Sequence, residues 1–231
     1  MTKRKIQYWV IPPQANAEFV AAMEDVLEVY SRPYNPDYPV LCMDEQPIQL
    51  TKETRQAIPA TKTCPRRVDY EYERAGTASV FMFTEPLLGW RKVRVRTSRT
   101  KTDWAQEMEQ LLRRRYAKAK KVLLVCDNLN THTRGAFYEA FEAPKARQLV
   151  QQIEFHYTPK HGSWLNISEN ELSSMTRQCI TGRRIPDIKM FRRETAAWSK
   201  HSNQKQRGVD WQFTIDKARS KLKSLYPKIQ F

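Results

Sequence analysis

Short apolar runs alternate along the chain with longer amphipathic stretches, and this pattern predicts an α/β protein. Runs suited to strands occupy residues 40–43, 77–83, 90–95, 121–126 and 153–156. Apolar residues at helical spacing predict helices over residues 16–30, 102–119, 134–142, 164–180, 186–201 and 214–225. Strands that alternate with helices in this order favour a single domain built in α/β layers.

Polar and proline-containing segments separate these elements. Residues 31–39 hold three prolines and predict a turn-rich link, and residues 51–75 are polar and predict mostly loop. We therefore expect residues 1–38 to form a linker and a helix that precede the core. Residues 39–231 would form the α/β domain, with basic helices at its C-terminal end.

The composition of the 231 residues suits a folded protein, since 40% are hydrophobic and 28% charged. No run approaches the roughly 18 apolar residues of a membrane-spanning helix, and the N-terminus lacks the apolar core of a signal peptide. Four scattered cysteines form no zinc motif. These features indicate a cytoplasmic protein, associated with the nucleoid if its partner is DNA.

Positive charge is concentrated near the C-terminus. The net charge of the whole chain is +15, and residues 173–231 hold 14 Lys and Arg against 4 Asp and Glu. Such an excess indicates a polyanionic partner, most simply nucleic acid. The alternative is a solvated basic surface without a specific partner.

Two of the predicted buried strands end in aspartate, at Asp44 and Asp127. An aspartate at a strand end either begins a turn or binds a ligand, because ligand sites gather at the carboxyl ends of strands in α/β sheets. Two of them on separate core strands favour a site. Two neighbouring carboxylates repel each other, and a hard divalent cation such as Mg²⁺ relieves that repulsion. A pair of such ions supports phosphoryl transfer.

A third acid would come from the helix predicted after Trp164. Glu169 and Glu171 flank its apolar face about equally, so helical periodicity does not choose between them. Either could also be a surface glutamate near a helix N-terminus.

Three segments, residues 42–45, 127–132 and 156–169, closely resemble the catalytic signature of DDE transposases, in the branch of bacterial insertion sequences related to the mariner superfamily. The similarity extends to Ile11-Pro12-Pro13, residues 68–72, Trp90 and Asp210-Trp211. The resemblance implies a ribonuclease-H-like fold, with a mixed central sheet flanked by helices. It assigns Asp44, Asp127 and Glu169 as catalytic metal ligands, the last through the pattern Leu-Asn-x-x-Glu.

The same resemblance implies what the protein does. It implies Mg²⁺, with Mn²⁺ as a substitute, and double-stranded DNA as the substrate. The reaction would be strand cleavage at element ends followed by strand transfer, commonly at TA, by a homodimer in the synaptic complex. Full-length members begin with a helix-turn-helix region. The chain resembles the part that follows it, as expected of a second reading frame joined by frameshifting, a truncated copy or a wrongly assigned start. Two alternative functions are an inactive DNA-binding fragment that regulates a complete transposase and a ribonuclease-H-like nuclease without strand-transfer activity.

Five basic residues around the third motif are candidates for contacts with DNA phosphates: Lys160, His161, Arg177, Arg183 and Arg184. Phosphate contacts supply affinity without sequence information. The histidines of the motifs, His132 and His161, either hold a loop together or touch DNA, and neither is expected to act as a base.

Overall fold

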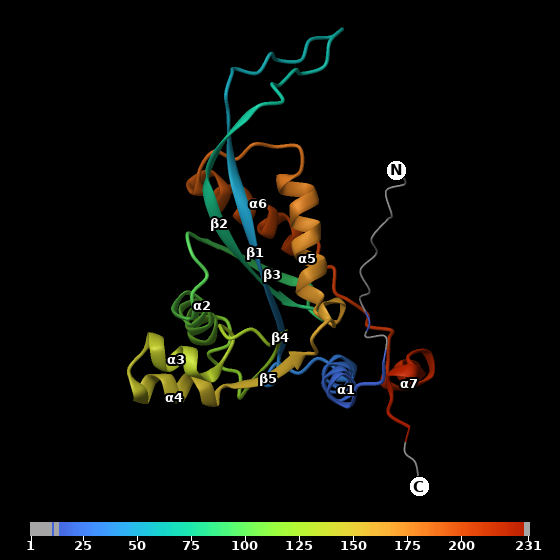
Figure 1. Cartoon of the computed structure of the whole chain (residues 1–231). Coiled ribbons are helices and arrows are strands. Elements are labelled where there is room, and N and C mark those ends of the chain that lie inside the picture. The colour runs from blue at the N-terminus through green and yellow to red at the C-terminus, as the bar shows by residue number, and fades with distance from the viewer. Residues whose placement is uncertain (1–10, 12–13, 229–231) are drawn as a thin grey trace.

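The computed structural model describes residue 11 and residues 14–228, and its centre is a mixed five-stranded sheet with the strand order β3-β2-β1-β4-β5 (Figure 1). The strands are β1 (Val40–Glu53), β2 (Tyr72–Glu85), β3 (Trp90–Arg96), β4 (Val122–Asp127) and β5 (Ile153–Thr158). The pairs β1–β2 and β2–β3 are antiparallel, whereas β1–β4 and β4–β5 are parallel. The predicted mixed sheet is confirmed.

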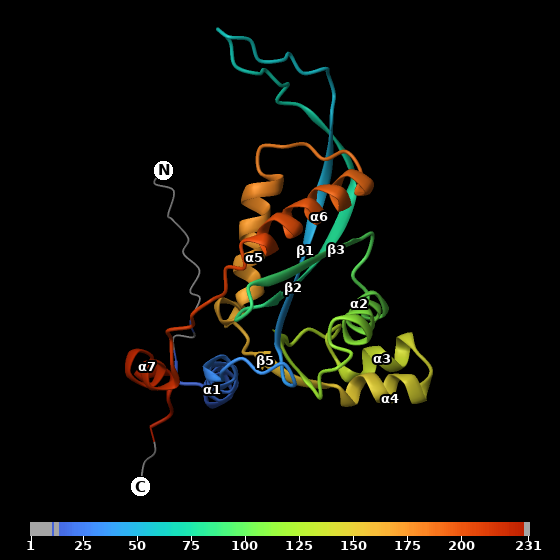
Figure 2. The same cartoon turned by 180° about the vertical axis from the view of Figure 1, so that it is seen from behind.

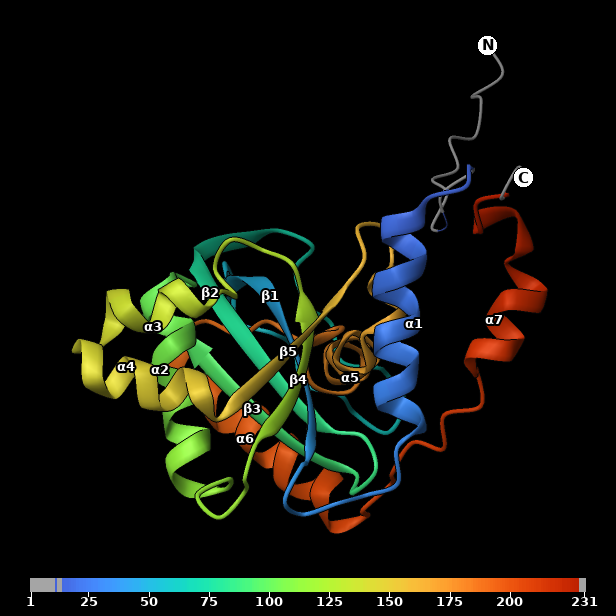
Figure 3. The ribbon, with the colours of Figure 1, turned by 90° about the horizontal axis from the view of Figure 1, so that it is seen from below.

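Helices cover both faces of this sheet. They are α1 (Ala17–Ser31), α2 (Lys101–Arg114), α3 (Arg134–Ala140), α4 (Ala143–Gln151), α5 (Ile167–Met175), α6 (Ile188–Gln204) and α7 (Ile215–Lys221). Helices α2, α3 and α4 lie on one face, and α5 and α6 on the other (Figure 2). Seen from below, α1 lies between α5, which is viewed along its axis, and α7 (Figure 3). Within the described residues, none of the helices is long and apolar enough to cross a membrane.

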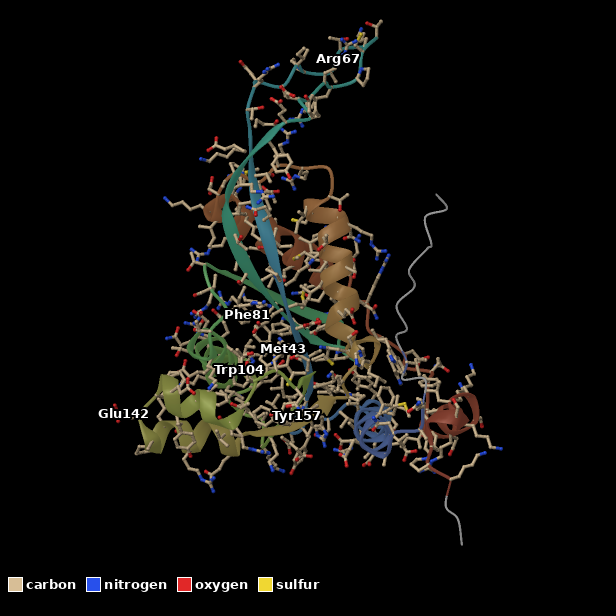
Figure 4. All side chains as sticks on the ribbon, in the orientation of Figure 1. Met43, Arg67, Phe81, Trp104, Glu142 and Tyr157 are labelled. Atoms are coloured by element: carbon tan, nitrogen blue, oxygen red, sulfur yellow. The ribbon has the colours of Figure 1, made fainter. Side chains whose placement is uncertain are left out.

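Alternation along β1 divides its side chains between separate cores. Leu41 and Met43 pack with Phe81 and Trp104 under α2 and α3, in the interior shown in Figure 4. Cys42 points to the opposite face and packs with residues of α1. Because successive residues of a strand point to opposite faces, Asp44 and Glu45 are also separated in this way.

The long β1–β2 hairpin differs from the sequence-based expectation. Strand β1 runs to Glu53, not residue 43, and β2 begins at Tyr72, within the segment expected to be mostly loop. Backbone pairing between the two strands continues beyond the core, with a register shift between Gln49 and Thr51. Ile48 and Leu50 are buried, but the side chains around them in this part of the hairpin are mostly polar, so the apolar pattern was too weak to predict strands. The hairpin projects from the body, with Arg67 near its tip (Figure 4).

Two predicted helices also differ in detail. The helix expected over residues 134–142 ends at Ala140, and the unpredicted helix α4 follows, with Pro144 in its first turn. Phe141 adopts an extended backbone conformation and separates the two helices. The helix expected over residues 164–180 consists of a 3₁₀ turn, α5 and a π-helical segment, Thr176–Ile180.

The C-terminal helix α7 is tied to α1. Arg219 donates two hydrogen bonds to Glu24, at 2.9 and 2.8 Å, and the Tyr226 hydroxyl donates a third at 2.8 Å. The expected connector over residues 1–16 lies largely outside the described residues, as do Pro12 and Pro13 of the Ile-Pro-Pro motif.

Asn166 fixes helix α5 to strand β1. Its side-chain oxygen caps α5 by accepting a hydrogen bond from Ser168 N at 3.1 Å, and its amide nitrogen donates to the Met43 carbonyl at 2.8 Å. Asn166 is 2% exposed. One side chain therefore sets the start of α5 against the backbone just before Asp44.

We predict that Asn166→Ala destabilises the protein more than Asn16→Ala. Asn16 caps α1 with one hydrogen bond, to Phe19 N, and such a cap contributes about 1 kcal/mol. Loss of Asn166 removes a cap and a buried hydrogen bond, so its expected cost is about 2–4 kcal/mol. Urea denaturation of the two variants measures the difference. Equal costs would contradict the linking role of Asn166.

Candidate active site

The two strand-end aspartates lie on neighbouring parallel strands, as predicted. Strands β1 and β4 pair from Val40–Leu123 to Cys42–Val125. The same register places Asp44 level with Asp127, two residues beyond the last pair. At this point β1 remains paired with β2, where Asp44 faces Met82, while its ladder with β4 has ended. The carboxylates of Asp44 and Asp127 therefore lie where the pairing of β1 with β4 has ended.

The pKa of Asp44 responds to the charges of both other predicted acids, Asp127 and Glu169. Burial raises the pKa of Asp44 from 3.8 to about 7, and the negative charges of Asp127 and Glu169 add to that increase. The Glu45 backbone N–H, 2.7 Å from Asp44 Oδ1, and the charge of His132 oppose it. Asp127 and Glu169 are thus near enough to disfavour the charged form of Asp44, an effect that a bound cation would relieve.

His132 lies between two other carboxylates at this edge. Its Nδ1 is 2.5 Å from Asp127 Oδ1, and its Nε2 is 2.9 Å from Glu45 Oε1. Burial lowers the pKa of His132, but the hydrogen bonds to Asp127 and Glu45 outweigh this effect and raise the pKa to about 9. The imidazole is therefore protonated at neutral pH and donates to both carboxylates.

The donor atoms fit a hard divalent cation in their chemistry, because three carboxylates are the ligands that Mg²⁺ and Mn²⁺ prefer. Their present orientation is not that of a closed coordination shell. Among the described residues, no three His, Cys, Asp or Glu side chains are gathered closely enough to hold a metal ion. Asp127 Oδ1 is turned toward His132, and Asp44 Oδ1 toward the backbone of Glu45.

The structure separates the roles of Glu169 and Glu171, which periodicity did not. Glu171 accepts hydrogen bonds from Arg91 Nε at 2.5 Å and from Nη2 at 2.8 Å. The two side chains are only 13% and 9% exposed, so Glu171 belongs to a buried ion pair. Glu169, half-buried in the first turn of α5, instead acts on Asp44.

A cleft of about 560 Å³ opens beside Asp127. Its walls come from the start of α1, the loop after β4 and the loop after β5, and they include Asn128, Lys160 and His161. Lys160 and His161 are exposed, and His161 adopts a left-handed backbone conformation with φ of 64°. The structure thus places the first two candidate DNA contacts next to the candidate active site.

The three candidate arginines lie toward the opposite end of α5. Arg177 is exposed on the π-helical segment. Arg183 forms an ion pair with Glu194 of α6 at 2.7 Å. Arg184 is half-buried and bonds Glu53 and the Asp69 carbonyl at the base of the hairpin. Arg184 therefore holds the hairpin, and Arg177 is the most available of the three.

Sequence reasoning assigned no role to Glu45 and left two roles open for His132. Their positions carried a signal, since Glu45 directly follows Asp44 and His132 lies five residues after Asp127. Only the folded chain shows that the two side chains meet across 87 residues of sequence.

Strand order, strand-end acids and flanking helices define a ribonuclease-H-like catalytic fold. The family model described as "DDE superfamily endonuclease" matches residues 39–192, and the chain belongs to that family. This confirms the predicted membership, and no curated protein matches the chain.

Solved structures of the Mos1 mariner transposase share the fold. A paired-end complex with Mn matches with a TM-score of 0.53 and 15% identity, covering 90% of this chain and 64% of that one. A pre-cleavage Mos1 transpososome matches with a TM-score of 0.52 and 14% identity, covering 92% and 69%. The catalytic domain of the same transposase matches with a TM-score of 0.51 and 13% identity, covering 85% and 92%. The chain thus spans slightly less than two thirds of the transposase in the first complex, and the ribonuclease-H-like fold is confirmed.

We predict that Asp44→Asn stabilises the metal-free protein at pH 8 but not at pH 4. Because the folded-state pKa of about 7 lies above the ordinary value of 3.8, ionisation of Asp44 costs folding free energy as pH rises through this window. Asparagine removes that cost. Asp44 retains contact with solvent, so the expected gain is about 1–2 kcal/mol, less than the full shift implies. Urea denaturation at the two pH values, in the presence of a chelator, measures this gain. An Asp44→Asn variant less stable than the wild type at pH 8 would contradict the prediction.

Proposed function

We propose that the chain is the catalytic region of an insertion-sequence transposase, which cleaves DNA strands at element ends and transfers them into a target. The observation that carries the proposal is the position of Asp44 and Asp127, level with each other at the parting of two parallel strands, with the charge of Glu169 acting on Asp44. Membership of the DDE endonuclease family supports this chemistry.

In this proposal Asp44, Asp127 and Glu169 hold divalent cations, Mg²⁺ or Mn²⁺. The repulsion that Asp127 and Glu169 exert on the charge of Asp44 supports such a site, and the Mos1 relatives were solved with Mn and with Mg. When bound, such cations activate the attacking oxygen and stabilise the leaving oxygen of a phosphodiester. For this, the Asp44 carboxylate must turn away from the Glu45 backbone, and Asp127 must offer the oxygen that His132 does not engage.

The cleft beside Asp127 is the proposed place for the DNA backbone. Lys160 is exposed in its wall, and no described carboxylate forms an ion pair with it, so its ammonium group can meet a phosphate next to the acids. Arg177 extends the positive surface along α5. Since the Mos1 relatives include complexes of paired transposon ends, we also propose that two copies of the chain act together on two ends.

We predict that Asp127→Asn and Glu169→Gln abolish nicking of supercoiled plasmid DNA in Mg²⁺ or Mn²⁺ while the protein stays folded. Both substitutions keep the side-chain shape and remove the charge that would hold the cation. Glu171→Gln is the contrasting variant, because it leaves Arg91 buried without its partner. Breaking such a pair costs about 3–5 kcal/mol, so Glu171→Gln should lower the Tm. Gel electrophoresis of the plasmid and thermal unfolding give the two readouts.

The outcomes separate the competing assignments. Nicking by Glu169→Gln that equals the wild-type activity would show that the third acid is assigned wrongly. Nicking by Asp127→Asn would remove the catalytic proposal. DNA binding by the wild-type chain without any metal-dependent nicking would instead support the alternative function, an inactive fragment that regulates a complete transposase.

We predict that Lys160→Gln combined with Arg177→Gln weakens binding to duplex DNA and flattens its salt dependence. Each lost phosphate contact reduces the slope of log K against log salt by about 1. Arg113→Gln combined with Arg114→Gln is the matched control, because both are exposed cations on α2, on the other face of the sheet. Fluorescence anisotropy over a salt series measures both. An equal change in the variant with Arg113→Gln and Arg114→Gln would show that the effect depends only on total charge.

A further inference from the structure

We propose that His132 is a positioning residue that holds the Asp127 carboxylate in place for a divalent cation by tying it to Glu45. The inference rests on the proposed function, because it assigns His132 to the same site. It concerns residues of this chain that act through Asp127 and not on DNA.

The contacts of His132 form a chain from the interior to the cleft. Glu45 is 3% exposed and His132 is fully buried, whereas Asp127 is 36% exposed. Both ring nitrogens are engaged, one with each carboxylate. The imidazole thus uses one oxygen of Asp127 and leaves the second for a ligand in the cleft that Asp127 lines.

The imidazole itself is held from several sides. The backbone N–H of His132 donates to the Leu129 carbonyl at 3.0 Å, and the Tyr157 hydroxyl donates to the His132 carbonyl at 2.8 Å. The Trp104 ring packs against the imidazole with a centroid separation of 5.5 Å. These contacts fix both the loop after β4 and the plane of the ring, so that Asp127 meets a rigid donor.

The same interaction joins β4 to β1 beyond the end of their backbone ladder. Pairing of the two strands stops at Cys42–Val125, and Glu45 lies three residues further along β1. The Glu45–His132–Asp127 chain spans the two strands where hydrogen bonds between their backbones have ended. Because Glu45 adjoins Asp44, this chain also sets the spacing between the two strand-end aspartates.

A second histidine provides a matched control. His156 of β5 is also buried between two carboxylates, with Nδ1 2.8 Å from Asp25 and Nε2 3.3 Å from Glu154. Neither acid belongs to the candidate active site. Replacement of His156 should therefore affect folding in a similar way without changing cation binding.

The test is Mn²⁺ binding by the full chain without DNA, measured by electron paramagnetic resonance and accompanied by thermal unfolding. We expect His132→Gln to weaken Mn²⁺ affinity about 10- to 100-fold, as is usual when a hydrogen-bond partner of a metal ligand is lost. His132→Asn, whose amide can reach Asp127 from the Nδ1 position, should recover part of the loss. His156→Gln should bind Mn²⁺ as the wild type does, even where its Tm falls.

Affinity of His132→Gln within twofold of the wild type would overturn the inference. If that variant does not fold, Glu45→Gln replaces it, since it keeps the side-chain volume and weakens only the far end of the chain. A folded Glu45→Gln with unchanged Mn²⁺ affinity would then overturn the inference. Wild-type Mn²⁺ affinity in Asp127→Asn would instead contradict the proposed site, whereas an impaired Asp127→Asn beside an unimpaired His132→Gln contradicts only the positioning role.

Discussion

The rest of the site depends on one constraint, which is that negatively charged side chains meet where the backbone pairing of β1 and β4 ends. Parallel pairing in this register brings Asp44 level with Asp127, and the charge of Glu169 reaches Asp44 from α5. Three carboxylates in one half-buried place lower the stability of the folded chain unless positive charge or hydrogen-bond donors offset them. The surrounding structure supplies some of these groups, and the proposed cations supply the rest.

The groups that stabilise the acids lie on the buried side of the site, and the side that faces the cleft is left open. His132 carries positive charge into the interior, between Asp127 and Glu45, and Asn166 sets the start of α5 against the backbone of Met43. Glu171 shows the opposite solution on the same helix, because its charge is matched by Arg91. Two glutamates one half-turn apart are thus distinguished by their partners, one with an arginine and one facing other acids.

Local patterns in the sequence predicted the sheet, most helices and the two strand-end aspartates, because apolar runs followed by an acid are visible without knowledge of the fold. The pattern did not reveal helix α4 as a separate element. Its first turn contains Pro144, and Phe141, with an extended backbone conformation, separates it from α3. The pattern also missed the extension of β1 to Glu53, where Ile48 and Leu50 are buried but the mostly polar residues around them are held by backbone pairing with β2. The contacts of His132 with Glu45 and of Glu171 with Arg91 join distant parts of the chain, so no local pattern contains them.

The net positive charge of this chain does not show which of its cations can contact DNA phosphates. The basic excess of residues 173–231 contributes to a long-range attraction for a polyanion, whatever the partners of the individual side chains. Much of that charge also does structural work, since Arg183 pairs with Glu194, Arg184 with Glu53 and Arg219 with Glu24. A cation already paired with a carboxylate must give up that interaction before it meets a phosphate. Contacts close to the acids therefore fall to exposed groups such as Lys160, which the fold places in the wall of the cleft beside Asp127.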